Sequence, residues 1–270
     1  METTESKRKD VLIIIPAYNE AKTIGKVLDA LEKPEIADIA DVLVMNDASK
    51  DGTQYIVLKR GHRVITHTFN LGYGSGLQAG YKYAARREYK YVIQIDADGQ
   101  HDPSNILKIY KELTTKGENG EYPDIVLGSR FVEGAVSFPV PISKKIAFVL
   151  FRNLIKLGTG TKIMDPTSGL QGLSSRTFWY YARYSHFDDK YPDANMLMQM
   201  LLLGYNVKEI PAYMVARTDG TSMHSGIIKP VIYMFRMMYS IIAVWVRVKV
   251  FKVDIGSKDD YEHIQALQKN

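Results

Sequence analysis

The sequence of 270 residues contains no cysteine. Disulfide bonds, thiolate metal sites and thiol nucleophiles are therefore excluded, and a reducing compartment is expected. The opening segment, METTESKRKD, is polar and lacks the apolar stretch of a secretory signal, so we expect no such signal. No uncharged apolar run reaches the ~18–20 residues that cross a bilayer. Internal repeats and low-complexity segments are absent as well.

What the chain does have is an excess of positive charge, with a formal net charge of +5 at pH 7. Its 46% hydrophobic and 24% charged residues are ordinary for a globular protein, and its length allows one large domain or two small ones. The charge favours anionic partners, such as nucleotides, phospholipid head groups or nucleic acid. The motifs below indicate the first two, and we expect no nucleic-acid partner.

Short apolar runs alternate with helical patterns along the first half of the chain. Such alternation predicts an α/β fold with a doubly wound, mostly parallel sheet and right-handed crossovers. After Gly128 the pattern is less regular. The expected strands are Val11–Ile15, Val42–Met45, Val64–Thr66, Tyr91–Ile95, Asp124–Leu127, Val207–Ile210 and Tyr213–Val215, and the expected helices include Ile24–Leu31, Ile106–Leu113, Ser143–Leu157 and Ala194–Leu203.

The segment YVIQIDADGQHDP, from Tyr91 to Pro103, places three polar side chains after a buried strand. In an extended chain Asp96, Asp98 and Gln100 point to one face. Oxygen ligands of this kind suit a hard cation such as Mg²⁺ or Mn²⁺, and a plain polar turn is the alternative. A calcium-binding EF-hand is excluded, because His101 and Leu107 stand where glycine and glutamate are required.

Polar clusters also follow the first two expected strands: Tyr18 and Glu20, then Asn46 and Asp47. The carboxyl ends of parallel strands meet at one edge of a sheet, so these clusters can build a single pocket. The glycines of NLGYGSG, beginning with Gly72, would let backbone approach a ligand. Their spacing matches neither a phosphate-binding loop nor a dinucleotide fingerprint, which excludes ATPase and dehydrogenase functions.

Five motifs occur in order: PAYNE, NDASKDGT, NLGYGSG, DADGQHDP and GSRF. Together they resemble the inverting family 2 glycosyltransferases. DPTSGLQG at Asp165–Gly172 and R-x-x-G-x-S at Arg217–Ser222 are similar to the dolichyl-phosphate mannose synthase-like and bacterial polysaccharide glycosyltransferase branch. The resemblance implies a GT-A fold, a nucleotide-diphosphate sugar donor, with a UDP-sugar favoured, and a divalent cation, Mg²⁺ or Mn²⁺.

The resemblance also implies roles for individual residues. Asp96, Asp98 and Gln100 would hold the metal on the diphosphate of the donor. Arg130 and Arg217 would clamp a phosphate, since guanidinium pairs with phosphate in a bidentate manner, and a surface salt bridge is the alternative for each. The residues expected to hold the base, the ribose and the rest of the nucleotide are Pro16, Tyr18, Glu20, Asp47, Gly72 and Asp96.

The nature of the acceptor decides whether a catalytic base is needed. A hydroxyl acceptor requires one, and Asp193 in YPDANML is our first choice, with Asp165 second; an ordinary helix-start acid is the alternative for Asp193. Polyprenyl phosphate requires none. The lipid-phosphate branch tends to carry arginine and serine where this chain has Lys144 and Phe148, and lysine where it has Met223 and His224. We therefore expect a lipid-linked saccharide acceptor in cell-surface polysaccharide synthesis, with polyprenyl-phosphate transfer or a non-catalytic nucleotide-sugar sensor as alternatives.

The segment from 227 to 252 is apolar but interrupted by basic residues, and its longest uncharged run, Met237–Val246, is too short to span a bilayer. It predicts two amphipathic helices, split near Pro230 or Arg236, lying peripherally on the inner face of the cell membrane. A homo-oligomer interface or a core helix is the alternative. The expected division is a glycosyltransferase domain at 1–226, these helices at 227–253 and a polar tail at 254–270.

Overall fold

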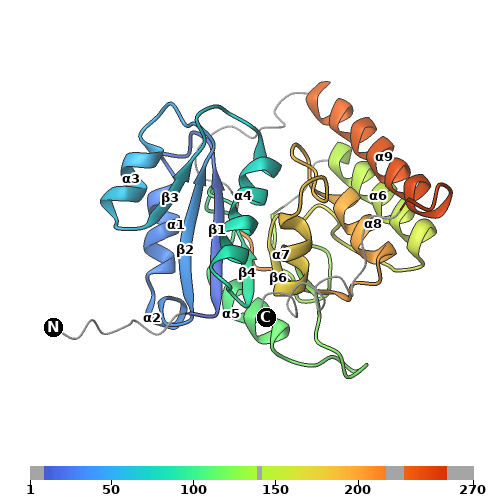
Figure 1. Cartoon of the computed structure of the whole chain (residues 1–270), viewed down its shortest axis with the longest axis horizontal. Helices are drawn as coiled ribbons and strands as arrows, with labels where there is room; N and C mark the ends of the chain where they lie inside the picture. Colours follow the sequence, from blue (N-terminus) through green and yellow to red (C-terminus); the bar gives the residue numbers. More distant parts are fainter. Residues whose placement is uncertain (1–8, 139–141, 217–227, 254–270) are drawn as a thin grey trace, which may run out of the picture.

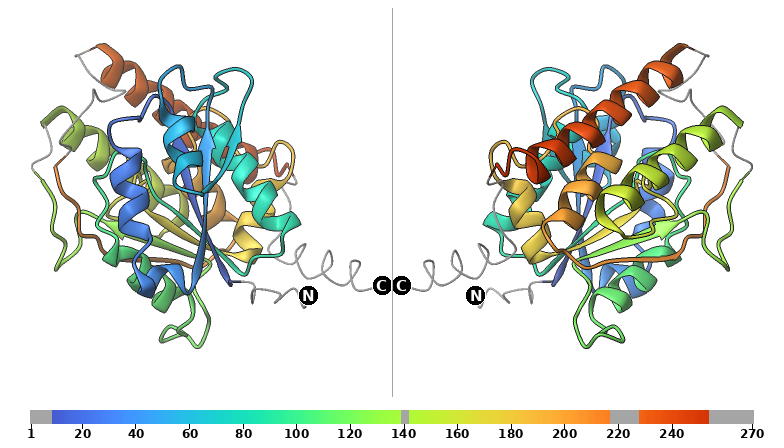
Figure 2. Two further views of the ribbon diagram at one scale, coloured as in Figure 1. Left: turned by 90° about the vertical axis from the view of Figure 1, so that its left-hand side faces the viewer. Right: turned by 90° about the vertical axis from the view of Figure 1, so that its right-hand side faces the viewer.

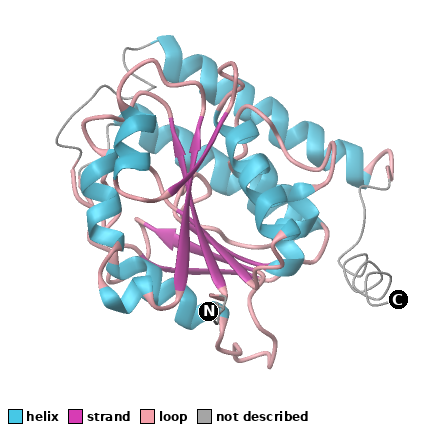
Figure 3. Ribbon diagram, turned by 60° about the vertical axis from the view of Figure 1, so that its left-hand side comes forward, coloured by secondary structure: helices cyan, strands magenta, loops and turns pink. Residues whose placement is uncertain are grey.

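A seven-stranded sheet lies between layers of helices in the computed structural model, which describes residues 9–138, 142–216 and 228–253 (Figure 3). The order of the strands is β3-β2-β1-β4-β6-β5-β7. Their bounds are β1 Val11–Ala17, β2 Ala40–Asn46, β3 Arg63–Thr66, β4 Tyr91–Gln94, β5 Ile125–Ser129, β6 Gln171–Ser174 and β7 Val207–Pro211.

The central strand β1 is the apolar run VLIII extended by two residues, and it pairs in parallel with both β2 and β4. Ile14 is aligned with Leu43 on one side and with Gln94 on the other. A strand in this position is covered on both faces, which explains why its residues are apolar without alternation. The predicted α/β class and the parallel pairing of these strands are confirmed.

Helices cover both faces of the sheet (Figure 1). Leu12 and Ile14 face α4, α6, α7, α8 and α9, whereas Val11, Ile13 and Ile15 face α1, α2, α3 and α5. The bounds are α1 Ile24–Leu31, α2 Pro34–Ala37, α3 Thr53–Lys59, α4 Tyr73–Arg86, α5 Ser104–Leu113, α6 Ile142–Thr159, α7 Ser175–Ala182, α8 Ala194–Leu202 and α9 Ile228–Lys249.

The strand β6 was not predicted. It runs antiparallel between β4 and β5 and lies at the end of the DPTSGLQG motif. Its sequence, QGLS, has no apolar run because α5 packs directly on it: a Cβ at Gly172 would lie 2.1 Å from the Ile109 side chain. The expected strand Tyr213–Val215 is wrong, since the described chain there makes only isolated bridges, Val136 with Tyr213 and His101 with Met214.

The C-terminal apolar segment forms one helix, α9, of 22 residues, so the expected pair of helices is wrong. Pro230 lies in its first turn, where the missing N–H is not needed. The helix packs across α6 and α8 (Figure 2). By length and composition alone, Val231–Lys249 would suffice to cross a membrane. We did not expect such a span from the sequence because only its uncharged runs were counted. The expected domain boundaries remain a prediction.

The glycines of NLGYGSG accommodate protein backbone. The loop at 188–190 lies on the start of α4, where the Ser75 N–H donates to the Asp189 carbonyl at 2.9 Å. A Cβ at Gly74 would stand 2.2 Å from the Asp188 carbonyl oxygen, whereas a Cβ at Gly76 would meet only Met45, at 3.8 Å. The close approach that the motif predicts therefore occurs between two loops of the protein itself.

We expect Gly74→Ala to lower the free energy of unfolding by about 1–3 kcal/mol, because the added methyl group forces the loop at 188–190 away from α4. Gly76→Ala is the matched control on the same helix. It should leave stability unchanged or raise it by up to about 1 kcal/mol, since alanine is the better helix former. Urea unfolding of the three proteins tests this. Equal stability of the two variants would contradict the packing argument.

Candidate active site

The carboxyl ends of β1, β2 and β4 lie side by side, because these strands are parallel neighbours. Hydrogen bonds join the loops that follow β1 and β2. The Asn19 N–H donates to Ser49 Oγ at 2.9 Å, and the Lys50 N–H donates to Asn19 Oδ1 at 2.8 Å. The expected polar clusters therefore follow adjacent strands at one edge of the sheet.

Asp47, at the end of β2, organises the NLGYGSG loop. Its Oδ1 accepts from the Leu71 N–H and lies 2.8 Å from His67 Nδ1, while its Oδ2 accepts from the Gly72 N–H at 2.8 Å. The side chain is almost fully buried. Asp47 and Gly72, both expected at the nucleotide, thus contact each other. His67 was not predicted, and its separation from Asp47 by a whole helix and strand left no local signal.

The other residues expected at the nucleotide lie on the neighbouring loop. Tyr18 is 42% exposed just beyond β1, so its ring is accessible for stacking on a base. Pro16 is half-buried in β1 itself. The Glu20 carboxylate accepts a hydrogen bond from Thr23 Oγ1 at 2.8 Å, immediately before α1. Glu20 therefore helps to form the start of that helix in addition to any contact with a ligand.

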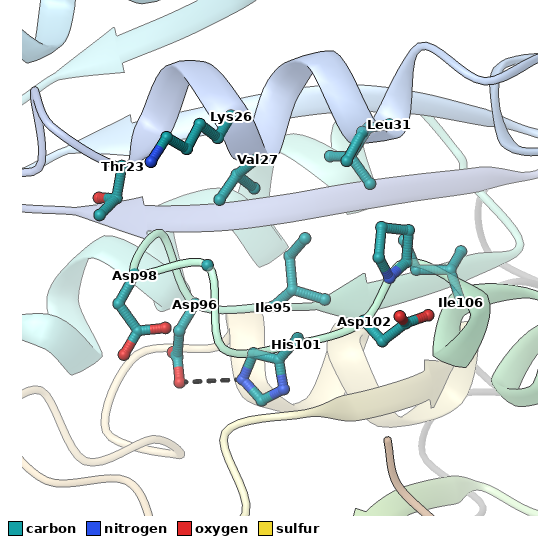
Figure 4. Close-up of a pocket in the computed structure, with 13 residues that line it drawn as sticks. Thr23, Lys26, Val27, Leu31, Ile95, Asp96, Asp98, His101, Asp102 and Ile106 are labelled. Atoms are coloured by element: carbon teal, nitrogen blue, oxygen red, sulfur yellow. Dashed lines mark hydrogen bonds and ion pairs between the residues drawn. The ribbon is translucent and has the colours of Figure 1, made fainter. Parts of the chain in front are cut away.

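Asp96 is held from two sides. Its Oδ1 accepts from the Tyr73 hydroxyl at 3.1 Å, and its Oδ2 lies 3.2 Å from His101 Nε2 (Figure 4). Burial alone would raise the pKa of Asp96, but these two contacts, together with the charge of Arg130, outweigh it and hold the pKa below its ordinary value. Neither Tyr73 nor His101 was predicted, although both stand within the motifs NLGYGSG and DADGQHDP.

The loop after β4 turns, with Gly99 at φ +75°, so the extended geometry assumed for Asp96, Asp98 and Gln100 is wrong. Asp96 and Asp98 still point to the same side of the loop (Figure 4). The Gln100 side-chain amide instead lies 3.5 Å from the Val215 carbonyl oxygen.

Two carboxylates fit a cation that takes its remaining ligands from water and phosphate, as Mg²⁺ commonly does. The described residues contain no group of three or more acidic, histidine or cysteine side chains that would form a complete cage. Asp96 and Asp98 are therefore the residues that would hold a divalent cation together with a diphosphate.

Arg130 and Asp165 form an ion pair. Arg130 Nε and Nη2 each donate to the Asp165 carboxylate at 2.7 Å, and the Arg130 N–H donates to it at 2.9 Å. Asp165 is fully buried, and Glu209 binds its backbone N–H at 2.8 Å. This geometry argues against Asp165 as a base and makes it the residue that orients Arg130. The other arginine expected to clamp phosphate, Arg217, lies outside the described residues.

Asp193 is the N-cap residue of α8, but its carboxylate makes no capping hydrogen bond. The carboxamide of Asn195 accepts the N–H groups of Asp193 and Met196 instead, at 3.0 and 2.9 Å. Asp193 Oδ2 accepts a hydrogen bond from the Tyr233 hydroxyl at 2.6 Å. Burial raises the pKa of Asp193 to about 6; the charges of Asp96 and Asp188 act in the same direction, and Tyr233 and Arg130 oppose them. The structure thus brings Asp193 into the electrostatic field of Asp96 and Arg130.

Fold and site together define a glycosyltransferase of GT-A architecture. Residues 12–181 match the family described as Glycosyl transferase family 2. The chain is 30% identical over 226 residues to an undecaprenyl-phosphate mannosyltransferase of Micrococcus luteus, covering 80% of this chain and 88% of that one. It is 26% identical over 225 residues to a polyprenol monophosphomannose synthase of Mycolicibacterium smegmatis, covering 80% and 81%. The chain belongs to glycosyl transferase family 2, as its motifs predicted.

A solved structure confirms the fold. The structure of glucosyl-3-phosphoglycerate synthase from Mycobacterium tuberculosis in complex with Mn²⁺, uridine diphosphate and phosphoglyceric acid matches with a TM-score of 0.63, covering 88% of this chain and 78% of that one. The sequence identity is 18%, so the similarity concerns the arrangement of the chain alone.

Asp193 should destabilise the metal-free protein when it is ionised. Its folded pKa, about 6, exceeds the ordinary value of 3.8, so the folded state binds the proton more tightly than the unfolded state. The resulting loss of stability is absent below about pH 4, grows between about pH 4 and 6, and is complete above about pH 6. Asp193→Asn should therefore raise the free energy of unfolding by roughly 1–3 kcal/mol near pH 7.5 and by little near pH 4. Urea unfolding at both pH values measures this, and a loss of stability at both would identify Asp193 as structural.

Proposed function

We propose that this glycosyltransferase moves a sugar from a nucleotide-diphosphate sugar to polyprenyl monophosphate at a membrane surface. The relatives named above carry polyprenyl-phosphate transferase names and align over most of the chain. This acceptor differs from the lipid-linked saccharide that the sequence led us to expect. The observation in the structure that carries the choice is a pair of arginines, Arg130 and Arg152.

Both guanidinium groups lie against the ring of Phe131, with the Cζ of Arg130 5.5 Å and that of Arg152 4.5 Å from its centroid. Arg152 Nε is buried and has no hydrogen-bond partner among the described residues. Burial also lowers the pKa of Arg152. A partly buried guanidinium beside a second one is a good receptor for a phosphate dianion. Arg152 would thus replace the arginine and serine that the branch carries elsewhere, where this chain has Phe148 packed on Phe131.

The donor would bind along the edge of the sheet, with its base near Tyr18 and the Asp47 loop and its diphosphate beside Asp96 and Asp98. Mg²⁺ or Mn²⁺ bound by these carboxylates supplies Lewis-acid stabilisation of the charge that develops on the leaving diphosphate. The structural neighbour was solved with Mn²⁺ and uridine diphosphate, and the shared fold is the ground on which we propose a cation and a UDP-sugar for this chain. A phosphate oxygen of the acceptor forms the new bond to the anomeric carbon as the bond to the diphosphate breaks, with inversion. The acceptor is already anionic, so no proton must be removed.

A hydroxyl acceptor is the second candidate. Asp193 favours it, because a carboxyl group with a pKa of about 6 is ionised at neutral pH and is a better base than an ordinary aspartate. In that mechanism Asp193 removes the proton of the attacking hydroxyl.

The outer face of α9 would contact the lipid surface. Phe235 and Tyr239 are 60% and 74% exposed on it, and Arg236 is exposed beside them. No acidic residue occurs between 231 and 253, which suits an anionic leaflet such as the inner face of the cell membrane. Met237 and Ile241 on the opposite face are buried against the protein. This arrangement favours a helix lying on the membrane over one that crosses it, and a homo-oligomer interface is the alternative.

The metal site can be tested with two substitutions in one loop. Asp98→Asn should lower transfer by at least about 100-fold, because a site with few protein ligands loses one of its charges. Asp102→Asn is the control: the Asp102 carboxylate accepts from the Ser104 N–H at 2.8 Å ahead of α5, a role that asparagine can fill. Transfer should also stop in EDTA and return with Mn²⁺. Wild-type turnover in EDTA, or an active Asp98→Asn protein, would remove the metal from the proposal.

The acceptor can be tested with short-chain polyprenyl monophosphate in detergent. Arg152→Gln should raise the KM for this acceptor by about 10- to 100-fold, the value of a charged hydrogen bond, and leave slow hydrolysis of the donor unchanged. Lys156→Gln, an exposed substitution on the same helix, should do neither.

The variant Asp193→Asn separates the two acceptor classes. At saturating donor, its kcat should fall by less than about 10-fold if phosphate attacks and by about 10²–10⁴-fold if a hydroxyl attacks. Transfer to a lipid-linked saccharide but not to polyprenyl monophosphate would overturn the proposed acceptor.

A further inference from the structure

The two carboxylate oxygens of Asp193 differ in their contacts with the described residues. Its Oδ2 is taken by Tyr233, whereas no described residue donates a hydrogen bond to its Oδ1. The carboxylate does not cap α8 and is costly to keep ionised. The charges that act on the pKa of Asp193 include those of Asp96, which would hold the metal, and of Arg130. The side chain is only partly buried, so Oδ1 is accessible to an incoming donor of hydrogen bonds.

Tyr233 is a rigid support for this carboxylate. Its ring packs edge-to-face with Phe151 of α6, at 6.4 Å between centroids, and with Tyr191, at 5.7 Å. Burial raises the pKa of Tyr233 far above its ordinary value, so the hydroxyl keeps its proton and acts as a donor. Tyr233, a residue of α9, therefore fixes the position of the Asp193 carboxylate.

A second contact attaches the same loop to α9. Asn195 Nδ2 donates to Ser240 Oγ at 2.9 Å and to Asp188 Oδ2 at 2.8 Å. The residues just before Asp193 also lie on the start of α4, through the close approach at Gly74. The loop that carries Asp193 is thus clamped between α4, at the nucleotide side, and α9.

We propose that Asp193 Oδ1 accepts a hydrogen bond from a hydroxyl group of the donor sugar, and that Tyr233 is the positioning residue for this contact. Beyond a diphosphate held at Asp96 and Asp98, the next part of the donor is its sugar, whose hydroxyl groups are strong donors to a carboxylate. The inference rests on the proposed nucleotide-sugar donor but not on the acceptor.

The test compares the binding of a nucleotide sugar with that of the matching nucleoside diphosphate. The donor is chosen as the UDP- or GDP-sugar that shifts the melting temperature of the wild type in Mn²⁺. Titration calorimetry without acceptor then gives both affinities. Asp193→Asn should weaken binding of the nucleotide sugar by about 10- to 100-fold, because a charged contact is lost. Tyr233→Phe should weaken it by about 3- to 10-fold, because the carboxylate loses its support. Both variants should bind the nucleoside diphosphate within about 2-fold of wild type.

Tyr239→Phe is the matched control, since it removes a hydroxyl group from the exposed face of the same helix. It should leave both affinities unchanged. If Tyr233→Phe lowers the affinity for both ligands equally, the substitution has a general effect on the fold. If neither variant lowers the affinity for the nucleotide sugar, sugar recognition is refuted. Both results overturn the inference. A wild-type protein that binds no nucleotide sugar overturns the donor in the proposed function as well, whereas failure with polyprenyl monophosphate leaves the inference standing.

Discussion

The parallel pairing of β1 with both β2 and β4 is the constraint on which the site depends. It sets the ends of three strands at one edge, and the loops that follow them carry Tyr18, Asp47 and Asp96. The apolar run of β1 is buried on both faces of the sheet, which places this strand at its centre with a parallel neighbour on each side. The antiparallel β6 then brings the DPTSGLQG loop beside β4, and with it Asp165, which orients Arg130.

Most charged groups of the site are held in place before any ligand arrives. Asp47 is fixed by loop N–H groups, Asp96 by Tyr73 and His101, and Arg130 by Asp165. Such preorganisation suits a reaction in which the protein stabilises developing charge and performs little covalent chemistry. Asp193 is different, because burial and like charges make its ionised form unfavourable. Proteins keep such groups at functional sites, where stability is exchanged for activity.

The helix α9 joins two parts of the proposed function. One face presents Phe235, Arg236 and Tyr239 to the surroundings, and the other places Tyr233 on Asp193. Both faces belong to one rigid element only about 10 Å across. A lipid acceptor held at the outer face would therefore arrive close to the sugar end of the site, without a separate domain to deliver it.

The sequence by itself determined the α/β class, the parallel strands and the family. Continuous apolar runs and loop motifs are local features, so they can be recognised without knowing the tertiary structure. It also predicted that Asp96 and Asp98 follow a buried strand and that Asp193 lies at the start of a helix, as the structure shows. Only the tertiary structure decided what those side chains contact. His67 and Tyr73 reach carboxylates that lie 20 and 23 residues away in the sequence, and Tyr233 reaches Asp193 across 40 positions. The strand β6 escaped prediction because its small residues are dictated by α5 packed above it. The helix α9 proved continuous because Pro230 lies in its first turn and Arg236 lies on its exposed face. Contacts of this kind depend on which elements become neighbours in space, and no local pattern of residues encodes that.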